Sequence, residues 1–418
     1  MKSNPIPLLD IALYHSNRSA FVEELRKACH NVGFFLLKHN IAPNRLPKEV
    51  LDEGRQFFQR SLDEKNMISY EHNPAFRGYM PLGVENTAGQ LDNREQIEYA
   101  VEYPLHAQGL NVYTKAWPAY HRLKSAPNPW PTSFQPSLQP KTMDYVQNVC
   151  QVADCLRDSL CLAMDLDPKV LEHKFNSSSL SSEASKDPKV LEHKFNSSSL
   201  SSEASNDLHR KDEVPHWVVK MISYPTNDAS NEESKDRSRS PSPIQGVGAH
   251  TDTNFLTLVL QDNEEEEDGG LQVFSQGDWI NVPTHHGTDV LICNLGEQAE
   301  TWSRGYFLAT PHRVLMKSRI RKPRISLPLF YNPCLSATME PLEESSVKHL
   351  KWDRPKPSTS ENDGNENAPK KHWRRPNNTM LTSVGENTFK SLARSHPQVF
   401  AKHHPDLSIL PDGKIVKK

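Results

Sequence analysis

The spacing of apolar residues predicts mainly helices in the N-terminal half of the chain. Between Ser19 and Val32 apolar residues recur every three or four positions, as on one face of an amphipathic helix. The run GFFLLKH at 33–39 predicts a buried strand, and Pro47 to Leu62 predicts a second helix. Residues 142–166 carry the longest helical pattern, whereas residues 70–104 predict loops.

The second half of the chain carries short apolar runs with the pattern of β-strands. These runs are separated by turn residues every eight to twelve positions, which is typical of a β-sandwich or β-barrel. They occupy residues 216–225, 249–262, 269–274, 279–284, 289–296, 309–315 and 323–332.

One segment occurs twice. DPKVLEHKFNSSSLSSEAS fills residues 167–185 and returns letter for letter at 187–205. Solenoid repeats keep only their core positions and come in larger sets, so this pair indicates a recent tandem duplication or a sequence-assembly error. Each copy begins Asp-Pro, a helix start, and predicts one short helix that ends at Phe175 or Phe195.

A fold that needs one such helix has no prepared partner for the second copy. We therefore expect deletion of residues 187–206 to leave solubility and activity intact, because this copy should form an insertion outside the core. Expression of the deletion variant, with its melting temperature and turnover, checks this. An insoluble deletion variant would count against it.

Three polar segments predict solvated loops rather than packed structure: 226–246, the acidic run 263–268, and 354–378. SRSPSP as a phosphorylation site and KKHWRR as a nucleic-acid contact are weaker alternatives. The net charge is −3 and the pI about 6.7. This balance predicts no binding to nucleic acid or to anionic membranes.

The N-terminal residues, the apolar runs and the cysteines bear on the expected compartment of the protein. The first residues carry no continuous apolar stretch of a signal peptide, and no 18-residue apolar run exists. The six cysteines form no CxxC pair, which suits a reducing compartment and argues against a cysteine-ligated zinc. We expect a cytoplasmic monomer that acts on a small-molecule substrate.

Three residues have the chemistry of a metal site. His250 and Asp252 stand two positions apart at the head of the predicted strand 249–262, so both side chains would point to one face. His312 precedes another apolar strand and is the best third ligand. Two histidines and one carboxylate suit non-heme Fe(II) and leave three positions open. A bidentate co-substrate would fill two of these positions and O2 the third.

Arg324 and Ser326 form a second pair with the same spacing. On a strand their guanidinium and hydroxyl would project from one face, which suits a carboxylate ligand. Ile325 and Leu327 would then face the opposite packing layer.

The ordered set of His250-Thr-Asp252, His312 and Arg324-x-Ser326 resembles the iron- and 2-oxoglutarate-dependent dioxygenases of the isopenicillin N synthase-like family. The flanks LTLVLQD, GGLQVF, WINVP, NLGE and PHRV, the start IPLLD with GFFLLKHNI, and the tail 385–407 are similar as well. The resemblance implies a mainly β protein with flanking helices. Its core would be a distorted double-stranded β-helix, or jelly roll, with a helical N-terminal region and a C-terminal helical tail. It also implies that Tyr224 contacts 2-oxoglutarate.

The resemblance divides the chain into five parts. An N-terminal α/β region would span 5–125, a helical segment with the duplication 139–210, and the jelly-roll core 211–335. A disordered linker would span 350–379 and the helical tail 380–410. The chain departs from the family in having Ile222 two positions before Tyr224 and a longer gap from His312 to Arg324, in which Arg321 could compete for the carboxylate role.

The resemblance implies an Fe(II)- and 2-oxoglutarate-dependent oxygenase that oxidises a small organic metabolite with O2 and releases succinate and CO2. In this interpretation His250, Asp252 and His312 hold iron and are the catalytic residues, and Arg324, Ser326 and Tyr224 hold 2-oxoglutarate. Two alternatives remain open. One is an oxidase like isopenicillin N synthase, which does not use 2-oxoglutarate. The other is a non-catalytic jelly-roll binding protein.

Overall fold

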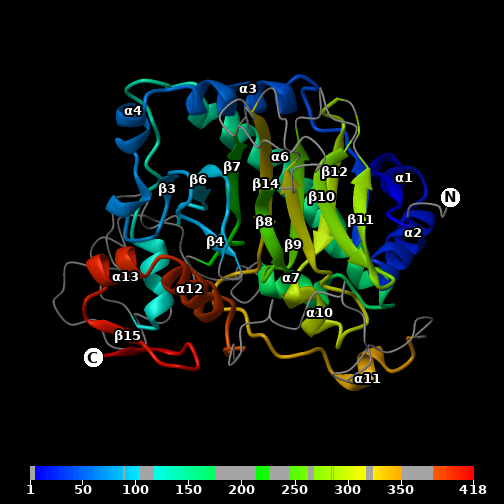
Figure 1. Cartoon of the computed structure of the whole chain (residues 1–418). Helices are drawn as coiled ribbons and strands as arrows, with labels where there is room; N and C mark the ends of the chain where they lie inside the picture. Colours follow the sequence, from blue (N-terminus) through cyan, green and yellow to red (C-terminus); the bar gives the residue numbers. More distant parts are fainter. Residues whose placement is uncertain are drawn as a thin grey trace, which may run out of the picture.

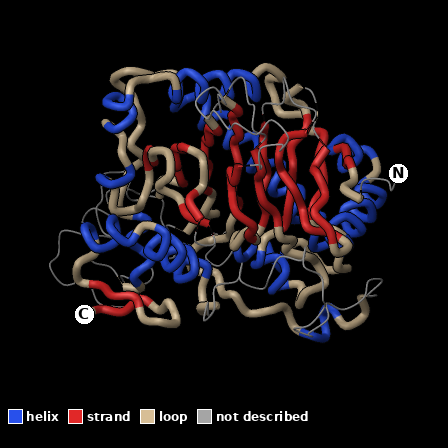
Figure 2. Tube along the Cα trace, viewed as in Figure 1, coloured by secondary structure: helices blue, strands red, loops and turns tan. Residues whose placement is uncertain are grey.

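The computed structural model describes ten stretches of the chain. They are residues 5–87, 90–103, 117–175, 213–225, 244–261, 268–283, 285, 287–316, 323–350 and 380–418. Strands gather in the centre of the molecule and helices surround them, with the two termini on opposite sides (Figure 2). No helix within these stretches is long and apolar enough to cross a membrane.

Eight strands form the larger sheet. Neighbours along it come from distant parts of the sequence, so the sheet ties the N-terminal region to the second half of the chain. Its order is β1 (Leu8–Asp10), β2 (Phe34–Lys38), β12 (Val290–Leu295), β9 (Leu256–Gln261), β14 (Arg324–Tyr331), β7 (Val218–Tyr224), β6 (Glu95–Ala100) and β3 (Gly78–Met80).

A smaller four-stranded sheet lies against the larger one (Figure 1). Its order is β11 (Asp278–Pro283), β10 (Asp268–Ser275), β13 (His312–Met316) and β8 (Ile244–His250). An apolar layer that includes Phe34, Ile292, Val273 and Val314 is buried between the two sheets. Two sheets packed face to face, antiparallel except for the parallel edge pair β1–β2, form the jelly roll, so the predicted fold class is confirmed.

Helices cover the outer face of the larger sheet, where they share one core cluster with it. In α6 the buried residues Tyr145, Val149, Val152, Leu156 and Leu160 recur every three or four positions and face the sheet. The helices of the N-terminal and middle regions are α1 (Ile11–Ser16), α2 (Arg18–Asn31), α3 (Leu46–Phe58), α4 (Leu62–Asn66), α6 (Leu138–Ala163), α7 (Lys169–Phe175), α10 (Glu297–Trp302) and α11 (Glu344–Val347), with 3-10 turns at Tyr70–His72 and Ala119–Lys124.

The C-terminal tail is helical, as predicted, and packs against the 3-10 turns at Ala119–Lys124 and Tyr70–His72. It comprises α12 (Val384–Ser395) and α13 (Pro397–His403), followed by a small hairpin of β15 (Leu407–Ile409) and β16 (Ile415–Lys417). A capping box of Ser383 and Glu386 starts α12. Arg122 holds Asp406 through two hydrogen bonds of 2.7 and 2.6 Å, which anchors the tail to the body of the protein.

Three sequence predictions need correction. The strand predicted over 249–262 is two strands, β8 and β9, because the chain turns at 251–255. The predicted helix 47–62 ends at Phe58, and Ser61 caps a separate helix, α4. The region 70–104 is not only loop, since β3 and β6 extend the larger sheet there; a short two-stranded sheet of β4 (Asn86–Thr87) and β5 (Gln90–Leu91) lies between them.

Several predictions fall outside the described residues. These are the second copy of the duplication, 187–206, most of the polar segments 226–246, 263–268 and 354–378, and Arg321. In the first copy, α7 ends at Phe175, as predicted, and the Asp167 carboxylate accepts a 2.9 Å hydrogen bond from the Lys169 amide at its start.

Candidate metal centre

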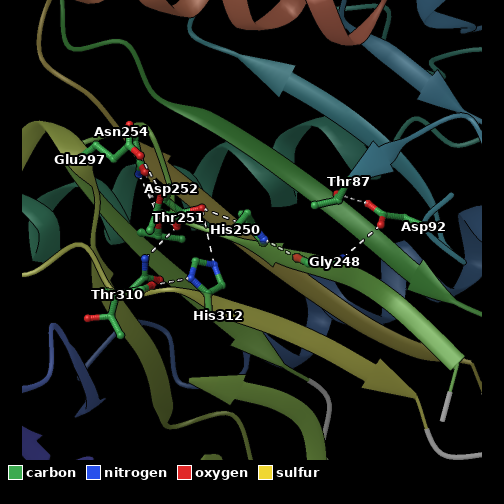
Figure 3. Close-up of polar contacts among 12 residues, drawn as sticks. Thr87, Asp92, Gly248, His250, Thr251, Asp252, Asn254, Glu297, Thr310 and His312 are labelled. Carbon is green, nitrogen blue, oxygen red and sulfur yellow. Dashed lines mark hydrogen bonds and ion pairs between the residues drawn. The ribbon is translucent and has the colours of Figure 1, made fainter. Parts of the chain in front are cut away.

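Two neighbouring strands bring His250 and His312 together. His250 is the last residue of β8 and His312 the first of β13, and the two residues are direct partners in the antiparallel ladder. Their ring centroids are 4.3 Å apart (Figure 3). His312 is only 8 % exposed, and its ring packs edge-on against Phe34 at 5.2 Å.

Asp252 reaches the same point from the loop between β8 and β9, not from a strand face as the spacing predicted. Its Oδ1 lies 3.6 Å from His250 Nε2 and 3.7 Å from His312 Nε2. Within the described parts of the chain, these three residues are the one group of His, Cys, Asp or Glu whose ligand atoms all converge, within 4.8 Å of one another. One ion can therefore contact all three side chains.

Backbone carbonyls orient both imidazoles. His250 Nδ1 lies 2.8 Å from Gly248 O, and His312 Nδ1 lies 3.1 Å from Thr310 O. A carbonyl only accepts hydrogen bonds, so each Nδ1 carries the proton and each Nε2 keeps its lone pair. Burial lowers the pKa of His250 to about 4, and the nearby His312 contributes to that shift, which keeps this imidazole neutral as a metal ligand must be.

Two polar side chains hold the Asp252 carboxylate. Thr257 Oγ1 donates to Oδ2 at 2.6 Å and Asn294 Nδ2 donates to the same oxygen at 2.8 Å, so Oδ1 remains available for a metal. Burial alone would raise the pKa of Asp252, but the nearby His312 and His250 and these hydrogen bonds bring it below its usual value. The carboxylate is therefore ionised.

The loop that carries Asp252 is held by the start of α10. The Glu297 amide donates to Asp252 O at 2.8 Å, and Thr251 Oγ1 donates to the Glu297 carboxylate at 2.6 Å. A Cβ at Gly296 would lie 2.1 Å from Asn254 O, so only glycine allows this approach of helix and loop. These contacts place the carboxylate between the two strand ends.

The hydroxyl of Thr257 gives the centre a direct test. Thr257→Val is isosteric but leaves Asp252 with one donor fewer, so we expect metal affinity to fall roughly 10- to 100-fold. Anaerobic titration with Fe(II) measures this. Thr388→Val, which removes a hydroxyl bonded to Val384 O in the tail, is the control and should bind iron as the parent does. Equal affinities in both variants would mean that Thr257 does not support a metal ligand.

The predicted carboxylate receptor lies on the inner face of the larger sheet. Arg324 pairs with Tyr224 across β14 and β7, and its guanidinium carbon lies 4.4 Å from the centroid of the Tyr224 ring. Ser326, two residues on, is 3 % exposed. Arg324 Nη2 is buried and has no hydrogen-bond partner among the described residues. Ile325 and Leu327 enter the outer core, as predicted.

This fold and this geometry define a class, the metal-dependent oxygenases built on a jelly roll. Two family descriptions match the chain in order. Residues 6–133 match the N-terminal region of the non-haem dioxygenases in morphine synthesis, and residues 219–333 match the 2OG-Fe(II) oxygenase superfamily. The chain belongs to these iron- and 2-oxoglutarate-dependent dioxygenases, the family predicted from its sequence.

Named relatives agree with this assignment. The 2-oxoglutarate-dependent dioxygenase frbJ of Dothideomycetidae sp. is 28 % identical over 82 % of this chain and 78 % of its own length. The homoarginine-6-hydroxylase 2-ODD-C23 of Glycine max is 28 % identical over 78 % of this chain and 82 % of its own. A full-length Neurospora crassa protein crystallised with alpha-KG and thymine shares the fold, with a TM-score of 0.59 at 16 % identity, over 93 % of this chain and 97 % of that one.

Proposed function

We propose that His250, Asp252 and His312 hold the Fe(II) of this oxygenase. We further propose that Arg324 and Ser326 bind the distal carboxylate of 2-oxoglutarate, with the Tyr224 ring against the guanidinium. The observation that carries the iron site is the convergence of two Nε2 atoms and one carboxylate oxygen, each with its other polar atom already bonded. The unpaired Arg324 Nη2 supports the co-substrate site, because a buried guanidinium requires a partner.

The described residues supply orientation and shielding. When bound, iron and 2-oxoglutarate supply the oxidising chemistry: O2 is consumed, 2-oxoglutarate is converted to succinate and CO2, and a C–H bond of the substrate is oxidised. Thr257 and Asn294 keep the Asp252 carboxylate in one orientation, and Phe34 excludes water from one side of His312. Arg324 would orient the co-substrate by a charge-assisted hydrogen bond.

We propose a small organic metabolite as the substrate. The names of the relatives support this, since the soybean relative is a homoarginine hydroxylase. The chemical outcome, hydroxylation, desaturation or ring closure, depends on which C–H bond the pocket presents.

We also propose that the enzyme acts in the cytoplasm as a monomer, without nucleic acid or membrane partners. Support comes from its cysteines: all six lie in described residues and all are free thiols, as expected in a reducing compartment. Burial raises the pKa of Cys29 and Cys293, which keeps both thiols protonated and unreactive. The monomeric state stays a prediction.

Anaerobic titration with Fe(II) and then 2-oxoglutarate tests the proposal. A weak visible charge-transfer band should form only when both ligands share one metal. Succinate release during turnover separates this enzyme from an isopenicillin N synthase-like oxidase, which would oxidise its substrate without it. A folded protein that forms no band would favour the binding-protein alternative.

A further inference from the structure

The inner face of the larger sheet carries charged residues on β7 and β6. Around Leu36 of β2, Ile292 of β12 and Val259 of β9, which are ladder partners, this face is apolar. Further along the same face, Lys220 of β7 is instead the ladder partner of Glu98 of β6. Since apolar residues would stabilise a packed interior at least as well as buried ions, these charges point to a ligand.

Lys220 and Glu98 belong to a larger buried set, here called the Glu98 cluster. Lys220 Nζ lies 3.1 Å from Glu98 Oε2, and Glu98 is 4 % exposed. Residues from β6, the preceding loops and the tail complete the set. The cluster comprises Glu85, Arg94, Gln96, Glu98, Lys220 and His396.

Glu85 contacts three other members of the cluster. It accepts a 3.0 Å hydrogen bond from Gln96 Nε2, and it lies 3.7 Å from Arg94 Nη2 and 3.5 Å from His396 Nε2. His396 is 4 % exposed and lies at the junction of α12 and α13, so the tail closes the cluster from outside.

The cluster is connected to the candidate iron site. Arg94 Nη2 lies 3.3 Å from Asp92 Oδ2, and Asp92 Oδ1 accepts from the Gly248 amide at 3.2 Å. The carbonyl of the same Gly248 orients His250 (Figure 3). Arg94 of the cluster is therefore linked through Asp92 to the backbone that orients His250.

The hydrogen-bonding capacity of the cluster is not filled by the described residues. Arg94 Nε, Gln96 Oε1 and His396 Nδ1 are buried without a hydrogen-bond partner there, and Glu98 Oε2 meets only the Lys220 ammonium. Gln96 Oε1 and Glu98 Oε2 accept hydrogen bonds, whereas Arg94 Nε donates one. The complementary ligand carries several N–H donors and one acceptor group.

The charges of this region also favour a cationic ligand. The carboxylates of Glu85, Glu98 and Asp92 outnumber the permanent cations of Arg94 and Lys220 by one. Burial lowers the pKa of His396, so its imidazole adds no positive charge at neutral pH. A ligand with one net positive charge would balance the region.

Building on the proposed function, we infer that the Glu98 cluster binds the substrate, and that the substrate is a small basic amino acid. Its ammonium or guanidinium N–H groups donate to Glu98 and Gln96, and its carboxylate accepts from Arg94. Compounds without a cationic nitrogen leave the one excess negative charge of this region unbalanced and are disfavoured.

Anaerobic calorimetry with L-lysine, L-arginine and L-homoarginine tests this on the protein loaded with Fe(II) and 2-oxoglutarate. At least one of the three should bind. The compound that binds should do so roughly 10- to 100-fold more weakly to Glu98→Gln, which keeps the shape and removes the charge. Citrulline, the uncharged counterpart of arginine, should bind more weakly than arginine.

Glu95→Gln is the matched control. Glu95 is also an ion-paired carboxylate of β6, but it bonds to Lys65 and Tyr79, away from the Glu98 cluster. This variant should bind the amino acid as the parent does. If Glu98→Gln does not fold, Gln96→Met removes another acceptor of the cluster and should weaken binding in the same direction.

The outcomes separate this inference from the proposed function. A charge-transfer band without binding of any of the three amino acids overturns the inference alone, as does equal binding by Glu98→Gln and Glu95→Gln. Absence of the band overturns the proposed function. The same calorimetric comparison on metal-free protein still tests the substrate class in that case.

Discussion

Replacing His312 by alanine is expected to abolish turnover while leaving the protein folded. The substitution removes one of three ligands, so iron affinity should fall by at least the roughly 10- to 100-fold that loss of a supporting contact produces. His312 is buried against Phe34, so the missing ring also leaves a small cavity. We expect that cavity to cost about 1–3 kcal/mol of the free energy of unfolding.

Metal titration, succinate release and the melting temperature together measure this effect. His349→Ala is the control, because His349 is exposed and forms a surface ion pair with Asp165 at 3.3 Å, away from the metal centre. This variant should match the parent in all three measurements. If His312→Ala still couples 2-oxoglutarate consumption to product formation, the three-residue iron site is wrong.

The second large effect is expected at Arg324. Arg324→Leu should raise the 2-oxoglutarate concentration needed for half-maximal turnover roughly 100- to 4000-fold, because it removes a buried charge partner worth about 3–5 kcal/mol. Iron binding should be unchanged, since Arg324 is not among the three converging ligands. Co-substrate dependence and Fe(II) titration of the same preparation separate the two effects.

Arg313→Leu provides the matched control. Arg313 lies on β13 but stacks on Trp279 at 4.1 Å and bonds to Gln272, away from the inner face. It should leave the 2-oxoglutarate requirement unchanged. If Arg324→Leu has no effect and Arg321→Leu does, the carboxylate role belongs to Arg321.

The sequence predicted the jelly-roll strands well where one or both faces are apolar. It missed β6, the strand EQIEYA, for a physical reason. Ile97 and Tyr99 alternate with Gln96 and Glu98, which would ordinarily place the polar face in water, yet the structure buries all four. Local pattern does not tell a solvent-facing polar residue from one buried with a charged partner.

The candidate site also has features that the local sequence pattern could not predict. Spacing suggested that His250 and Asp252 share a strand face, and their proximity is real although Asp252 lies on a loop. The partners of Asp252, Thr257 and Asn294, stand in the flanks LTLVLQD and NLGE, which carried the family resemblance without a stated role. Only the packing of β9 against β12 brings these two side chains to one carboxylate.

A crystal structure with Fe(II), or Mn(II) as its substitute, and 2-oxoglutarate most directly tests the central claim that three distant side chains hold one catalytic ion. The ion should lie about 2.0–2.2 Å from His250 Nε2, Asp252 Oδ1 and His312 Nε2. The far carboxylate of 2-oxoglutarate should bond to Arg324. An ion bound elsewhere, or 2-oxoglutarate bound away from that ion, would contradict the account.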